Sequence, residues 1–272
     1  MKKLYLLGAL LIISTAVLLF TSCETTTSGA PTSFAIEAAT STTVKLTWAV
    51  PTEGTPDKYR VYFKPLGATG FYEVTELANT VFTYTHDPLD STGTYYVAAK
   101  AGSNEYESDT KTTIPIHGTS TSLAELNATG NSGYGWTRAD GAAGVFSMTS
   151  ASNASSVDLY LTNFAANYTT TPYNIASPDM GPTDAGGVVP TGSWRVNGIS
   201  DPVTDPQAAL PANSATTYFN YTSISAYPSY LGVYTADGYY AMIKVDGLNS
   251  SAGTVSAESW YQLVKGLRLI QH

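Results

Sequence analysis

The chain has 272 residues, of which 21 are acidic and 13 are basic, so its formal net charge is −8 at pH 7. This excess of acidic side chains argues against DNA, RNA or an anionic lipid surface as a partner, because all three carry negative charge. The single cysteine is Cys23, which excludes a disulfide bond within the chain, so packed cores must supply the stability.

The N-terminus has the parts of a secretory signal peptide. Lys2 and Lys3 form a short basic start, an uncharged apolar run extends from Leu4 to Phe20, and small residues precede Cys23. These residues resemble the signal of bacterial lipoproteins, which implies cleavage before the cysteine and acylation of its side chain. The alternative is a transmembrane helix with a chance cysteine, for which the apolar run has a marginal length.

The lipoprotein resemblance implies a protein of the bacterial cell envelope. The acylated Cys23 would hold it to the lipid bilayer, in the outer membrane if the organism has one. Residues 1–22 would be the signal peptide. Residues 23–33 have no apolar periodicity and are expected to form a lipidated, flexible tether.

Residues 34–115 show the period of β-strands. Apolar residues alternate with polar or small ones at 44–49 and again at 59–64, and turns rich in Pro and Gly follow both runs. Six or seven short strands at this spacing predict an antiparallel β-sandwich.

The same segment resembles a fibronectin type III domain. Trp48 lies in the second expected strand, and Leu89 stands six residues before Tyr95. In that family this Leu–Tyr spacing marks a corner at which the phenol hydroxyl hydrogen-bonds to backbone near the turn. The resemblance implies a spacer or binding module that carries no chemistry of its own.

The second half of the chain is also β-rich. Residues 116–122 lack periodicity and are expected to be a linker, and residues 123–272 a further domain. Seven prolines between positions 165 and 213 forbid long regular elements there, whereas Asp237-Gly238 predicts a hairpin turn. The predicted fold class is all-β: an N-terminal fibronectin type III-like β-sandwich followed by a C-terminal antiparallel β-rich domain with long loops.

Two runs in this domain, Gly232–Val245 and Gly253–Gln262, resemble the HmuY-like β-fold of bacterial surface lipoproteins. The founding members of that family bind haem through two histidines. This chain departs from them, because its histidines near the domain are His117, in the expected linker, and His272, the last residue. The resemblance therefore implies a fold and not haem binding, and we expect no cofactor.

The sequence lacks the usual signs of catalysis. Three scattered histidines argue against a catalytic zinc site, and no nucleophile elbow, metalloprotease helix or phosphate loop is present. Paired carboxylates are the remaining option, but the aspartates of this half are interpreted as solvated loop residues: Asp140, Asp158, Asp179, Asp184, Asp201 and Asp205. We therefore expect no catalytic residues, no metal and no enzyme.

Tyrosine and tryptophan are abundant in the C-terminal domain, and their rigid side chains with a polar tip suit binding surfaces. Loops on a β-scaffold favour recognition, so the candidate ligand-binding residues are those of the Pro-rich middle: Tyr168, Tyr173, Trp194, Tyr227 and Tyr230. The favoured function is a non-catalytic binding module for a small ligand, glycan or protein, with no nucleic-acid partner. The alternatives are a structural or assembly component of the envelope and a glycan hydrolase that uses loop carboxylates.

Overall fold

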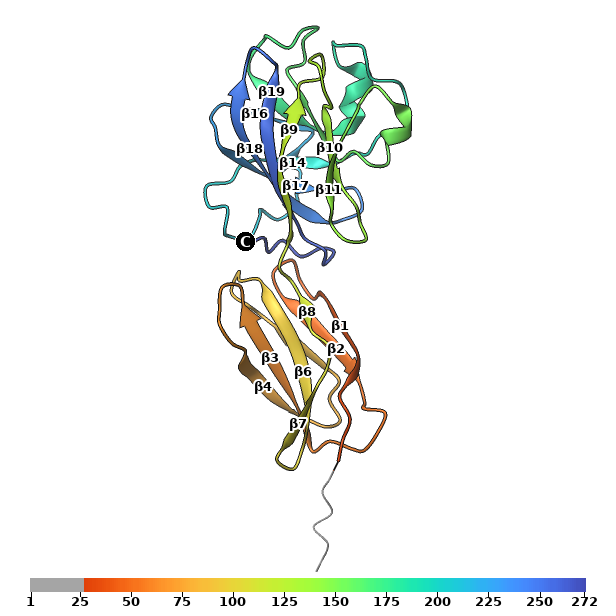
Figure 1. Cartoon of the computed structure of the whole chain (residues 1–272), viewed down its shortest axis with the longest axis vertical. Helices are drawn as coiled ribbons and strands as arrows, with labels where there is room; N and C mark the ends of the chain where they lie inside the picture. The colour runs from red at the N-terminus through yellow and green to blue at the C-terminus, as the bar shows by residue number, and fades with distance from the viewer. Residues whose placement is uncertain (1–26) are drawn as a thin grey trace, which may run out of the picture.

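A computed structural model describes residues 27–272 and shows two β-domains stacked end to end (Figure 1). The expected signal peptide, the acylated Cys23 and the first part of the tether lie outside the described residues. Within residues 27–272, no helix combines the length and the hydropathy needed to cross a membrane. The C-terminus lies at the junction between the two domains (Figure 1).

The N-terminal domain is a sandwich of two antiparallel sheets. One sheet has the order β1 (Thr32–Ala38), β2 (Val44–Ala49), β5 (Thr83–His86). The other has the order β4 (Tyr72–Ala78), β3 (Lys58–Pro65), β6 (Gly93–Ala101), β7 (Asn104–Glu107), and β8 (Lys111–Thr112) also pairs with β6. The predicted antiparallel sandwich is confirmed.

Alternation along β2 and β3 builds the core of this domain. Val44, Leu46 and Trp48 of β2 are buried and face buried residues of the opposite sheet. The Trp48 indole meets the Tyr59 ring edge-on at 5.6 Å between centroids. Burial of these large side chains is the main contribution to the stability of a domain that has no disulfide.

The corner around Tyr95 differs from the family pattern. The Tyr95 ring is fully buried, but its hydroxyl lies 2.9 Å from Nδ1 of His86, so its partner is an imidazole and not the backbone. Leu89 keeps its spacing from Tyr95 and yet is 84% exposed, with a φ of 52°. The expected backbone hydrogen bond is therefore replaced by a side-chain pair that connects β5 to β6.

The C-terminal domain also consists of two antiparallel sheets. The five-stranded sheet has the order β11 (Ala143–Phe146), β10 (Gly133–Trp136), β12 (Leu159–Thr162), β13 (Tyr173–Ala176), β16 (Tyr221–Ile224). The six-stranded sheet has the order β15 (Tyr218–Phe219), β14 (Gly198–Pro202), β17 (Ser229–Tyr234), β18 (Tyr240–Asn249), β19 (Thr254–Tyr261), β9 (Ile116–Ala124). Two short 3₁₀ turns, η1 (Ala151–Asn153) and η2 (Pro178–Thr183), lie in the loops.

The expected linker is wrong. Residues 116–122 belong to β9, which pairs antiparallel with β19 at the edge of the six-stranded sheet. The segment carries no hydrophobic alternation, because one of its faces is solvent-exposed and Gly118 occupies a position on the inner face. The chain therefore passes from one domain to the other with few residues between β8 and β9.

The hairpin predicted at Asp237-Gly238 is confirmed, since β17 and β18 pair across it. The last strand, β19, ends at Tyr261. The residues beyond it form a tail that turns back onto the N-terminal domain.

This tail completes the core of the N-terminal domain. Val264, Leu267 and Leu269 are buried in the same apolar cluster as Trp48. The backbone N–H of Arg268 also donates to the carbonyl of Ser41 at 2.8 Å. The two domains are thus joined by an apolar contact as well as by the covalent crossing at β8 and β9.

Candidate functional site

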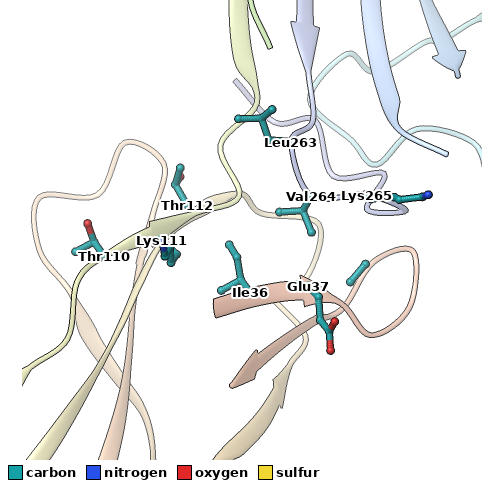
Figure 2. Close-up of a pocket in the computed structure, with 9 residues that line it drawn as sticks. Ile36, Glu37, Thr110, Lys111, Thr112, Leu263, Val264 and Lys265 are labelled. Atoms are coloured by element: carbon teal, nitrogen blue, oxygen red, sulfur yellow. The ribbon is translucent and has the colours of Figure 1, made fainter. Parts of the chain in front are cut away.

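An open cleft of about 640 Å³ lies where the tail meets the N-terminal domain. Three segments that are distant in sequence line it, residues 36–38 at the end of β1, residues 110–112 around β8 and residues 263–265 after β19. Figure 2 shows Ile36 and Val264 beside one another at its centre. The cleft exists because the tail leaves the C-terminal domain and inserts Val264 into the other core.

The rim of this cleft is polar and carries two lysines. Glu37 is bound to Lys45 at 2.6 Å, whereas Lys111 and Lys265 form no ion pair with any described residue. Thr110 and Thr112 add hydroxyl groups beside Lys111 (Figure 2). The Lys265 side chain extends along Gly238, away from Ile36 (Figure 2), so Lys111 is the cation nearer the floor. An apolar floor with a lysine on the rim suits a small ligand that has an apolar body and a negative group. None of the three segments is distinctive alone, so the sequence did not predict this site.

The predicted aromatic residues do not form one site. Tyr173 is 2% exposed in the main core of the C-terminal domain, and its hydroxyl donates to the carbonyl of Tyr168. Trp194 is buried in a separate cluster, and its Nε1 donates to the carbonyl of Pro190 at 2.9 Å. Burial also raises the pKa of the Tyr173 hydroxyl above its ordinary value.

The other two candidates lie on different sides of the six-stranded sheet. Tyr227 packs against the main core, and burial raises the pKa of its hydroxyl. Tyr230 packs against a third cluster on the outer face, where its ring is 6.5 Å from that of Trp260. Four well-formed clefts in residues 27–272 are lined by other side chains. Four of the five residues are thus divided among three packing clusters, and Tyr168 is half-buried in a loop outside them.

The two histidines expected at loose ends of the domain lie close together. His117 stands on β9 and its ring stacks on Trp260 at 5.3 Å between centroids, while His272 stacks on the same indole at 3.7 Å. Nε2 of His117 is also 2.7 Å from a carboxylate oxygen of Glu258. Burial lowers the pKa of His272 below its ordinary value. The sequence placed His117 in a linker and so could not predict this cluster.

The aspartates were expected in loops that water reaches, and this is wrong for two of them. Asp158 is fully buried, and its carboxylate binds Arg138 and Arg195, each at 2.7 Å. Asp184 is 6% exposed and accepts hydrogen bonds from the hydroxyls of Tyr160 and Thr162. Both carboxylates are therefore held by structural partners.

Other aspartates are exposed, Asp140 and Asp205 in loops and Asp201 on β14. Asp201 and Asp205 are exposed and line an open cleft of about 410 Å³ beside β14. Asp140 is exposed in the turn between β10 and β11, where it accepts a hydrogen bond from the N–H of Ala142. Residues 27–272 contain no group of three or more His, Cys, Asp or Glu side chains placed to hold a metal ion.

Comparison with known proteins bears on the first domain. Residues 29–117 match the fibronectin type III domain family. Similar solved structures include the FN5 domain of Drosophila Lar, at 16% identity over 32% of this chain and 94% of that chain, with a TM-score of 0.27. The fn3 domain of the human collagen alpha-1(XX) chain is 19% identical over 32% of this chain and 85% of that one, with a TM-score of 0.27.

The fn3 domain of human contactin 1 is 16% identical over 36% of this chain and 87% of that one, with a TM-score of 0.27. No curated protein matches the chain. The protein thus contains a fibronectin type III domain at residues 29–117, a module that commonly serves for binding or spacing and is generally non-catalytic.

Proposed function

We propose that the protein is a lipid-anchored component of the bacterial cell envelope that binds a ligand without transforming it. The observation that carries the binding role is the cleft at the domain junction, with its apolar floor and the two lysines of its rim. The ligand class that fits is a small molecule or glycan end with an apolar face and a carboxylate or sulfate group.

The inventory of reactive groups supports a non-catalytic role. General acid–base catalysis needs a titrating side chain that can reach a substrate. His86 is buried against Tyr95, and His117 and His272 are stacked on Trp260. Asp158, the most buried aspartate, is bound by two arginines. His86, His272 and Asp158 are thus occupied by structural partners, and the half-exposed His117 is paired with Glu258.

The anchoring part of the proposal rests on the sequence around Cys23. Detergent phase partition of the protein made in bacteria tests it. Wild-type protein should enter the detergent phase and Cys23→Ala protein should stay in the aqueous phase or keep its signal. Wild-type protein found wholly in the aqueous phase would contradict the anchor.

The HmuY-like assignment of residues 123–272 also stays part of the proposal. The runs that carry the resemblance, Gly232–Val245 and Gly253–Gln262, fall on β17–β18 and on β19. β18 and β19 pair directly along most of their length. The resemblance implies that the strand of the first run pairs with a final aromatic strand, and the pairing of β18 with β19 supports the proposal. A solved structure of a member with the same strand order would test it.

The binding part is tested by calorimetry with defined probes. Uronic-acid oligosaccharides and medium-chain carboxylates present the expected chemistry, and neutral analogues of the same size are the controls. The double variant Lys111→Ala, Lys265→Ala should lose binding, whereas Lys58→Ala, which does not line the cleft, should keep it. Binding that is equal in the two variants, or multiple-turnover hydrolysis of any oligosaccharide, would contradict the proposal.

A further inference from the structure

A second open cleft, beside β14, differs in its charge from the cleft at the domain junction. Its volume is about 410 Å³, which lies within the range of about 300–1,000 Å³ found for small-molecule sites. Its walls come from the end of β14 and the loop after it, at residues 200–205, 208, 209 and 211, and from residues 216 and 217 before β15. The cleft thus combines three stretches of one long loop region with the end of a strand.

The charge of this cleft is wholly negative. Among residues 27–272, Asp201 and Asp205 are the charged residues that line it. Both are exposed, and none of the ion pairs between the described residues includes either of them. A cleft lined by one sign of charge concentrates the electric field and raises the local concentration of counter-ions. A cationic ligand is therefore favoured.

Much of the remaining wall is apolar. Val203, Ala208, Ala209 and Pro211 supply aliphatic surface. Val203 packs against the cluster on the outer face of the six-stranded sheet, and Ala209 packs against the core of the N-terminal domain. Because covering apolar surface is favourable, a cation that also carries an aliphatic chain fits better than a bare one.

Hydrogen bonds fix the loop before any ligand binds. The N–H of Val203 donates to the carbonyl of Tyr230 at 2.8 Å, and the N–H of Leu210 donates to the carbonyl of Arg268 at 2.9 Å. The Leu210 side chain is 1% exposed. The N–H of Gln207 also donates to the Asp205 carboxylate at 2.9 Å. A site with walls fixed in advance loses little conformational entropy on binding.

A metal ion matches this cleft poorly. Calcium takes about six to eight oxygen ligands at close range, whereas much of the wall is aliphatic. The described residues also contain no group of three or more His, Cys, Asp or Glu side chains placed to hold a metal ion. An aliphatic diamine matches better, because two ammonium groups complement two carboxylates and the methylene chain covers apolar surface.

We propose that the cleft beside β14 binds an aliphatic diamine or a short polyamine. One ammonium group pairs with Asp201 and a second with Asp205, while the methylene chain lies against Ala208 and Ala209. This ligand is opposite in charge to the one proposed for the junction cleft. The described lining residues of the two clefts do not overlap.

Three probes of equal chain length separate charge from shape: cadaverine, pentylamine and pentanediol. Isothermal titration calorimetry with the full chain measures their affinities. Cadaverine should bind about tenfold more tightly than pentylamine, because it makes a second charge-assisted contact, and pentanediol should not bind. Added sodium chloride should weaken the binding of cadaverine, since exposed charges are screened by salt.

Single variants assign the two contacts. Asp201→Asn and Asp205→Asn should each weaken cadaverine binding about tenfold and so remove its advantage over pentylamine. Asparagine at position 205 keeps an acceptor for the N–H of Gln207, so the turn is retained. Asp90→Asn removes the same charge at an exposed position that lines none of the four clefts, and it should bind cadaverine as wild type does. Thermal melting verifies that the variants are folded.

NMR amide shifts locate the ligand, and we expect changes within residues 200–217. Equal affinities for cadaverine and pentanediol, equal cadaverine binding by Asp201→Asn and Asp90→Asn, or shift changes confined to other residues would overturn the proposal. Calcium that displaces cadaverine when present at a lower concentration would also overturn it, because the occupant would then be a metal ion. The Lys111→Ala, Lys265→Ala variant should bind cadaverine normally, so this proposal and the one for the junction cleft fail separately.

Discussion

Thr92 and Gln271 are bound to each other twice, although 179 residues separate them in the sequence. The backbone N–H of Thr92 donates to Oε1 of Gln271 at 3.1 Å, and its hydroxyl donates to the backbone carbonyl of the same residue at 2.9 Å. Thr92 precedes β6 of the fibronectin type III domain, and Gln271 is the penultimate residue of the chain. The end of the second domain is therefore fixed to the first.

We predict that Leu267→Ala destabilises both domains together. Leu267 is fully buried in the core of the N-terminal domain, so the loss should be about 2–5 kcal/mol. Hydrogen exchange followed by mass spectrometry on fragments of each domain measures it. Val196→Ala, at a 61% exposed position, is the control and should change stability by about 0.5 kcal/mol or less. Faster exchange confined to one domain would contradict this shared core.

Trp48→Ala should cost about 3–5 kcal/mol of unfolding free energy, as for other buried large aromatic residues. Trp48 is 5% exposed and packs on Tyr59, which agrees with the inward position predicted for it. Urea unfolding measures the cost, and Val50→Ala at a 56% exposed position serves as the matched control. A loss no greater than that of the control would show that the core is centred elsewhere.

His86 should make the protein less stable in mild acid. Burial lowers the pKa of its imidazole below the ordinary value, so the folded state takes up this proton only at lower pH than the unfolded chain does. Stability is therefore lost as pH falls below about 6.5, where the unfolded chain starts to bind the proton. Thermal melts from pH 7.5 to 5 should show a steeper decline for wild type than for His86→Gln, which keeps an acceptor for Tyr95. Parallel melting-temperature curves for wild type and His86→Gln would contradict a lowered pKa of His86.

Asp158 is expected to be structural. Asp158→Asn leaves Arg138 and Arg195 without the buried carboxylate that they share, and the cost should be about 3–5 kcal/mol. Asp201→Asn, at an exposed position of β14, should change stability by about 0.5 kcal/mol or less. Chemical denaturation of the two variants distinguishes them. Similar stabilities for both would indicate that the buried network does not hold the domain.

The sequence determined the local structure. Alternation at residues 44–49 and 59–64 places Trp48 and Tyr59 inside, and Asp237-Gly238 marks the β17–β18 hairpin, because side-chain direction and turn conformation depend on near neighbours. Trp48, Leu89 and Tyr95 carried the resemblance to the fibronectin type III family, which the match over residues 29–117 supports.

Tertiary structure alone decided the rest. A strand at a sheet edge that faces water, as β9 does, needs no hydrophobic alternation, so residues 116–122 gave no signal of pairing with β19. The burial of Asp158 depends on two arginines distant in sequence, and the junction cleft on a tail that returns to β1. Such contacts join segments whose separate sequences are unremarkable, and only the folded chain brings them together.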